Sequence, residues 1–203
     1  MCNSEYNGGL TREQFLFFEI RVVANLLCQG YSREEALEKI KNENLFQFPT
    51  ERMLTTITKA CFRRIDALKS ESLIENLAYS SVDVAKQINL YAMMRYNRIV
   101  WDFMLNVIGE KFRTQQLDFS SKDLNLFFFD LQEQNESIAS WSDSTISKIK
   151  QVLKKTLIEC GYLDNSKSEE LNTVYLYPEL ETGIRENCDL VVFPAFNFFE
   201  EGY

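Results

Sequence analysis

The chain has 203 residues, of which 45% are hydrophobic and 26% charged, so it can form one soluble globular domain, alone or with a small appendage. It contains no histidine, which excludes histidine-based acid–base catalysis and nearly all catalytic zinc sites but does not exclude a carboxylate-dependent enzyme. The net charge of −8 is uneven: residues 1–160 hold 20 basic and 21 acidic side chains and residues 161–203 hold 2 and 9, so the body is near neutral.

The N-terminal region is predicted to be helical. Residues 1–9 are polar, end in two glycines and are predicted to form a flexible leader. A capping-box pattern at Thr11 predicts a helix over residues 11–29, and a second pattern at Ser32 predicts a short, charged helix. Capping residues and apolar periodicity predict four more helices. The first begins at Thr50, the second covers residues 71–79, the third begins at Ser81 and the fourth covers residues 99–112. Residues 10–116 are therefore predicted to form an N-terminal helical bundle.

The C-terminal region has a different order of elements. Ser120 is predicted to open a helix, the chain turns after Asn135, and a basic helix begins at Ser142. Residues 173–177 and 190–193 are predicted to be two short strands, each ended by a proline. Helix, turn, basic helix and strands follow one another as in a winged helix-turn-helix. We therefore expect residues 117–203 to form a C-terminal helix-turn-helix-like subdomain with a small β element and an acidic tail.

The basic helix is the strongest candidate for a binding surface, because it carries four lysines and no acid between Ile146 and Ile158. At helical spacing its apolar residues share one face, and its polar residues form two adjacent outward stripes. One stripe contains Ser144, Lys148, Gln151 and Lys155, and the other contains Ser147, Lys150 and Lys154. Contact with nucleic-acid phosphates and a merely solvated lysine face are equally compatible with this pattern.

Two smaller basic groups are further candidates for phosphate contact. One consists of Lys59, Arg63 and Arg64, and the other of Arg95 and Arg98, which flank a tyrosine expected to be exposed and available for stacking. Arginine suits phosphate because its planar guanidinium binds two oxygens at once. For each group taken singly, pairing with acidic residues of the helices is the better-supported interpretation.

Other functional classes have little support. The sequence contains no phosphate-binding glycine loop, kinase motif or zinc-ligand spacing, so no cofactor or metal is expected and nothing favours an enzyme. The polar N-terminus and the short apolar stretches predict neither a signal peptide nor a transmembrane span. Five dispersed cysteines are typical of reduced thiols, so a cytoplasmic location is expected.

Four segments also carry a family resemblance. Three of them are residues 9–21 (GLTREQFLFFEIR), 42–47 (NENLFQ) and 90–95 (LYAMMR). The fourth is residues 141–163, which begins with Trp141-Ser142 and ends with Gly161-Tyr162-Leu163. Together they resemble the BrxA component of bacteriophage-exclusion (BREX) phage-defence systems, over about residues 9–178. The resemblance implies a helical fold related to the NusB-like antitermination factors, binding of double-stranded DNA, and an operon that also encodes a DNA methyltransferase. It offers no motif of catalytic residues.

The sequence and the resemblance together predict a non-enzymatic double-stranded DNA-binding component of a BREX system that works with other BREX proteins. No membrane and no small-molecule substrate are expected as partners. The alternative is a protein–protein adaptor that docks on a larger defence subunit through its acidic C-terminal region and the apolar residues 190–199.

Overall fold

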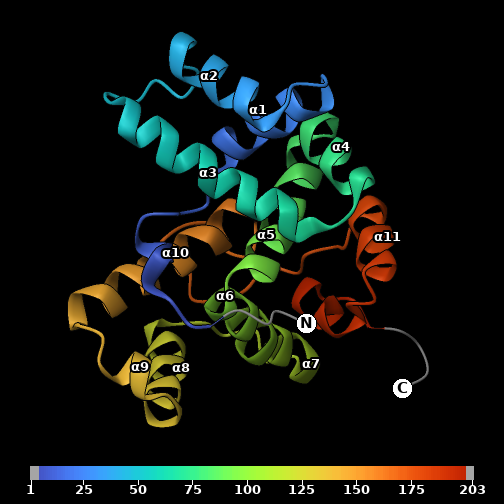
Figure 1. Cartoon of the computed structure of the whole chain (residues 1–203). Coiled ribbons are helices and arrows are strands. Elements are labelled where there is room, and N and C mark those ends of the chain that lie inside the picture. Colours follow the sequence, from blue (N-terminus) through green and yellow to red (C-terminus); the bar gives the residue numbers. More distant parts are fainter. Residues whose placement is uncertain (1–4, 200–203) are drawn as a thin grey trace.

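Helices make up nearly all of the regular structure in residues 5–199, which are the part of the chain that this computed structural model describes (Figure 1). The prediction of a mainly α fold is confirmed. The described residues contain no named strand, and their one isolated β-bridge joins Asp118 to Glu170. None of the described helices is both long and apolar enough to cross a membrane.

The first five α-helices follow the predicted order. They are α1 (Phe17–Cys28), α2 (Arg33–Glu43), α3 (Glu51–Leu68), α4 (Glu71–Tyr79) and α5 (Val82–Tyr96). Ser32 and Glu35 form the expected capping box of α2, in which each side chain accepts the other residue's backbone N–H. Helix α5 runs through the centre of the molecule and is buried on nearly all sides, so the other helices pack around it (Figure 1).

The predicted start of the first helix is wrong. Residues Gly8–Thr11 form a short 3₁₀ helix, η1, and α1 begins six residues after Thr11. Leu16 precedes α1 in the left-handed region, with a φ of 51°. The reason is a tertiary contact. The buried guanidinium of Arg64 donates hydrogen bonds to the carbonyls of Glu13, Gln14 and Phe15, and these bonds hold the segment out of the helix.

The described part of the predicted leader forms hydrogen bonds, one of them to the helical body. Asn7 caps η1 by accepting the backbone N–H of Gly9, and the hydroxyl of Tyr6 donates to Asp102 at 2.6 Å. Tyr6 and Asn7 of the predicted leader thus form hydrogen bonds within the structure, and residues 1–4 lie outside the described residues.

The predicted helix over residues 99–112 is one helical rod with a widened turn. It consists of α6 (Arg98–Phe103), the π-helical turn η2 (Met104–Gly109) and α7 (Glu110–Thr114). Gly109 lies in this turn, where an added Cβ would come within 3.2 Å of the backbone nitrogen of Ala195. The C-terminal segment therefore packs closely against the helix at this wide turn.

The next three helices are α8 (Ser121–Gln134), α9 (Glu136–Ala139) and α10 (Asp143–Glu159). Ser120 and Asp123 form the predicted capping box at the start of α8. The predicted turn after Asn135 contains the short helix α9. Helices α8 and α9 lie at the opposite end of the molecule from α2 (Figure 1).

The two predicted strands are wrong. Residues 173–177 pair with no other strand in the described chain and are followed by α11 (Pro178–Glu186), in which Pro178 occupies the first turn. Residues 190–193 belong to the 3₁₀ helix η3 (Leu190–Phe196). A short apolar run fits a strand and a buried helical turn equally well, and here the threefold period buries Phe193 and Phe196 against the body.

The apolar core continues across the predicted domain boundary near residue 117. Buried side chains from both regions form one cluster, which extends from Leu10 to Phe196. Helix α11 packs on α4 and α5, and η3 packs on η2, so the C-terminal region closes one side of the helical body. The acidic tail residues 200–203 lie outside the described residues.

Candidate nucleic-acid interface

Helix α10 has a buried apolar face and an exposed polar face, as its sequence predicts. Ser142 caps it by accepting the backbone N–H of Thr145 at 3.3 Å, and the hydroxyls of Ser144 and Thr145 lie 2.9 and 3.0 Å from the Ser142 hydroxyl. The apolar face is buried and consists of Ile146, Ile149, Val152, Leu153 and Leu157, with Thr156 beside them. Burial of this face fixes which side chains of α10 remain on the surface.

The polar side chains of α10 differ in exposure and pairing. Exposed ones are Ser144, Ser147, Lys148, Gln151 and Lys155, and Lys154 is half-buried. Within residues 5–199, no carboxylate forms an ion pair with Lys148, Lys154 or Lys155. These three ammonium groups are therefore uncompensated positive charges on the surface of α10.

Lys150 is turned toward α8. Its Nζ donates to Oδ1 of Asn125 at 2.9 Å and lies 5.4 Å from the centre of the Phe128 ring. Partial burial lowers the pKa of Lys150, and the opposing attraction of Asp143 is the smaller effect. Lys150 thus joins α10 to α8, and its charge lies beside the exposed stripe rather than in it.

The Lys59 group divides into three different environments. Lys59 is exposed, and no acid of the described chain pairs with it. Arg63 is half-exposed, but its guanidinium is paired with Glu13 at 2.5 Å and donates to the Tyr96 hydroxyl at 2.8 Å. A phosphate would have to displace the Glu13 carboxylate to reach this arginine.

Arg64 is unavailable to any external ligand. It is 1% exposed, and besides its bonds to the carbonyls of residues 13–15 it packs among core side chains. Burial lowers the pKa of this guanidinium. The prediction that Arg64 contacts DNA is therefore corrected, because a core arginine whose two terminal NH2 groups donate to backbone carbonyls has a structural role.

The Arg95 prediction is corrected for a similar reason. Its guanidinium forms a buried ion pair with Asp189 at 2.8 Å and also donates to the hydroxyl of Tyr91. Arg98 remains accessible, although it pairs with Asp102 at 3.4 Å and stacks over the ring of Tyr6. The charge pattern alone could not show that Arg95 is neutralised, because Asp189 lies 94 positions later in the chain, whereas the partner of Arg98 lies four residues away on α6.

The tyrosine expected to be exposed between these arginines is Tyr96, and it is half-buried. Its ring lies under the Arg63 guanidinium at 5.7 Å, so its outer face is occupied. Tyr96 thereby brings Arg63 close to the Arg95–Arg98 turn. In the described chain, no side-chain contact joins these arginines to the lysines of α10, which leaves α10 as the candidate interface.

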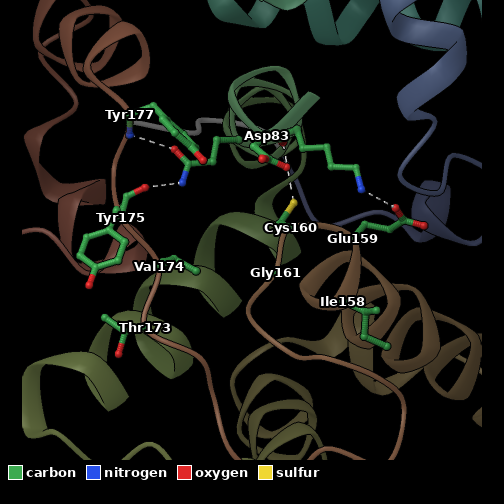
Figure 2. A pocket seen from close by; sticks show the side chains of 11 residues that line it. Asp83, Ile158, Glu159, Cys160, Gly161, Thr173, Val174, Tyr175 and Tyr177 are labelled. Atoms are coloured by element: carbon green, nitrogen blue, oxygen red, sulfur yellow. Dashed lines mark hydrogen bonds and ion pairs between the residues drawn. The ribbon is translucent and has the colours of Figure 1, made fainter. Parts of the chain in front are cut away.

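A second concave site lies at the C-terminal end of α10, and no sequence motif indicates it. It is a cavity of about 420 Å³ between the end of α10, the start of α5 and residues 173–177 (Figure 2). Among residues 5–199, no cluster of three or more His, Cys, Asp or Glu side chains is arranged to hold a metal ion.

Comparison with known proteins gives a consistent family assignment. The family model described as BrxA matches residues 4–188. A protein named BREX protein BrxA from Bacillus cereus (strain H3081.97) is 35% identical over 162 residues, which cover 80% of each chain. A second protein of that name, from Escherichia coli O9:H4 (strain HS), is 28% identical and matches 86% of this chain and 81% of its own.

A solved structure shows the same fold. The crystal structure of an uncharacterized protein from Magnetospirillum magneticum superimposes with a TM-score of 0.80 at 22% identity, and covers 95% of this chain and 98% of that one. The helical architecture is therefore an arrangement that a solved protein shares over nearly its full length.

Proposed function

Because the chain belongs to the BrxA family of BREX phage-defence proteins, we propose that it serves such a system by binding double-stranded DNA through α10. The observation that supports this proposal is the set of three lysines, Lys148, Lys154 and Lys155, whose charges no described carboxylate compensates. A duplex carries a dense row of phosphates, and lysines bind it as point charges without reading its sequence. We expect contacts mainly to phosphate and modest sequence preference.

The start of α10 adds a second element to the proposed surface. Ser142, Ser144 and Thr145 place three hydroxyls at the N-terminal end of the helix, where backbone N–H groups and the helix dipole favour an anion. A duplex lying along the exposed stripe would meet these hydroxyls first and Lys155 last. The stripe between Ser144 and Lys155 spans three helical turns, about 16 Å at 1.5 Å per residue.

The finer structural predictions form part of the same proposal. Helices α8 and α10, joined through α9, are proposed to act as a helix-turn-helix-like unit in which α10 faces the DNA. The body of α1 to α7 is proposed to be the NusB-like part, and the protein is proposed to be non-enzymatic and to act beside other BREX components.

Charge reversal tests the proposal. We expect replacement of Lys148, Lys150, Lys154 and Lys155 by glutamate to abolish binding of a labelled random-sequence duplex in a fluorescence anisotropy titration. Reversal at Lys69 and Lys167, two exposed lysines on other elements, is the control for general loss of positive charge. If the quadruple variant binds the duplex as wild type does, α10 is not the contact surface.

A second candidate function is the adaptor role, and one observation favours it. Leu190, Val191 and Phe199 are 44%, 54% and 45% exposed and, with Phe198 and Arg113, border a largely apolar hollow of about 510 Å³. Exposed apolar side chains grouped in this way are typical of protein–protein contacts.

The adaptor role is tested without truncating the chain, because η3 also fills the core. Leu190→Ser with Val191→Ser changes only exposed side chains of η3. Reconstitution with purified BREX proteins, followed by size-exclusion chromatography, should then show loss of a complex while duplex binding persists. An unchanged elution profile would contradict docking through this hollow.

A further inference from the structure

The outward side of α8 presents two exposed apolar side chains between two unpaired charges. Leu126 is 62% and Phe129 is 56% exposed. Lys122 and Glu133 are exposed as well, and within residues 5–199 neither has an ion-pair partner. At about 100° per residue, these four side chains lie within about 60° of one another around the helix axis. They form one continuous surface, which we call the α8 face.

The α8 face lies opposite the side of the helix that packs on the body. Leu124, Phe127 and Leu131 are buried there, and the Phe127 ring packs edge to face on Phe103 of α6, with 5.5 Å between the ring centres. The helix is therefore held by its inner side alone. Exposed apolar side chains grouped between charges on the outer side of such a helix are typical of a protein–protein contact.

The order of residues in the α8 face is complementary to itself. Lys122 precedes Leu126 by four residues, three residues separate Leu126 from Phe129, and Glu133 follows four residues later. When two copies of α8 lie antiparallel, Lys122 is opposite Glu133 of the second copy. In the same register Leu126 is opposite Phe129 of the second copy, and symmetry makes each pair occur twice. Parallel pairing would instead bring like charges together at both ends.

A hollow beside the α8 face provides room for an aromatic ring. It has a volume of about 400 Å³, and its walls include Val107 of the wide turn η2 together with Leu126 and Phe127 of α8. Leu126 belongs both to this hollow and to the α8 face. In the antiparallel register, Phe129 of the second copy therefore lies at the mouth of the hollow, where an aromatic anchor contributes most to binding.

We propose that this protein forms a twofold-symmetric dimer in which the α8 faces of two copies pack antiparallel. The charge pattern selects a second copy as the occupant, because each end of the α8 face carries the charge that the other end requires. One helix pair buries less surface than the roughly 800 Å² per partner of a standard interface. We therefore expect a dimer that dissociates in the micromolar range of concentration.

The proposed symmetry has a consequence for α10. Lys150 of α10 contacts Asn125 and Phe128, which lie about a quarter turn around α8 from the α8 face. A twofold axis perpendicular to both α8 helices keeps this side of the two copies on one side of the dimer. One duplex would then meet two α10 helices, as in dimeric helix-turn-helix proteins. This consequence rests on the proposed function, whereas the pairing of α8 does not.

Sedimentation equilibrium of the full chain without DNA tests the pairing. Lys122→Glu and Glu133→Lys should each weaken dimerisation about tenfold, because each reversal turns two attractive pairs into repulsive ones. An equimolar mixture of the two variants, and the chain that carries both substitutions, should regain wild-type affinity. This rescue also shows that both variants are folded. Leu126→Ser with Phe129→Ser should weaken dimerisation about 100-fold.

A cross-link without a spacer locates the contact. A carbodiimide joins a carboxylate directly to an amine. Within one copy, Lys122 and Glu133 are about 16 Å apart along the helix, at about 1.5 Å per residue, which is too far for a direct bond between their side chains. In a mixture of ¹⁵N-labelled and unlabelled chains, we therefore expect mass spectrometry to find Lys122 of one copy joined to Glu133 of the other.

Matched reversals elsewhere control for net charge. Lys167→Glu and Glu34→Lys change exposed residues on other parts of the chain and should leave dimerisation unchanged. The proposal is overturned if the wild type stays monomeric across the micromolar range, if the reversals on α8 leave dimerisation unchanged, or if a dimer forms without the Lys122–Glu133 cross-link. A monomeric chain whose α8 face binds a different BREX protein would overturn it as well.

Discussion

Replacing two lysines of the exposed α10 stripe should change the salt dependence of DNA binding by a predictable amount. Each phosphate neutralised by a lysine contributes about −0.9 to the slope of log K against log salt concentration. Contact by all four lysines of α10 would give a slope of about −3.6 from this helix. Lys148→Gln with Lys155→Gln should therefore flatten the slope by about 1.8.

The same relation gives the loss of affinity. Between 1 M and 0.1 M salt, each contact changes the binding constant about eightfold, so the double variant should bind about 60-fold more weakly at 0.1 M. Fluorescence anisotropy titrations of one duplex at several salt concentrations measure both quantities. Equal slopes for wild type and variant would refute phosphate contact by this stripe.

The matched control carries the same change of charge elsewhere. Lys69→Gln with Lys167→Gln removes two exposed positive charges from other elements. If the attraction is only that of the overall charge, both double variants will lose affinity equally. If α10 lies against the duplex, only the α10 variant will change the slope, because DNA releases a counterion to the solution only where a lysine neutralises a phosphate.

Three further predictions concern the packing of the fold. Arg64→Met should lower the free energy of unfolding by about 3 kcal/mol in chemical denaturation, since it leaves buried carbonyls without a donor, and the folded variant should bind DNA as wild type does. Gly183→Ala should lower the free energy of unfolding by about 1–2 kcal/mol, because the new Cβ would lie 2.5 Å from the buried Leu73 side chain. The cost of this overpacking exceeds the gain in helix propensity. In a Cys2→Ser background at mildly alkaline pH, a thiol reagent should label the exposed Cys188 first and leave Cys61 unlabelled until unfolding, because burial raises the pKa of Cys61 to about 12; prompt labelling of Cys61 would contradict this packing.

Helices that are determined by local chemistry could be predicted from the sequence. Ser32 with Glu35 and Ser120 with Asp123 form capping boxes whose partners are three residues apart, so neighbouring residues contain the whole signal. Ser142 and the apolar period of α10 likewise place that helix and its exposed lysines.

Features that depend on distant residues could not be predicted in this way. The start of α1 is displaced by Arg64, about 50 positions later in the chain, and the charge of Arg95 is neutralised by Asp189 from the C-terminal region. Sequence spacing contains neither contact. Pro178 was interpreted as ending a strand, whereas it begins α11, because proline is compatible with both roles and packing on α4 and α5 decides between them.

The way the N-terminal segment is fastened has a consequence for biosynthesis. Residues 6–15 are translated before their partners, which are Arg64 and Asn89 in the middle of the chain, Asp102 on α6, and α10 beside η1. This segment therefore stays without its native contacts until most of the chain has been translated. The helix pairs of α1 to α5 can form before this segment packs, because both helices of each pair are translated earlier than α10.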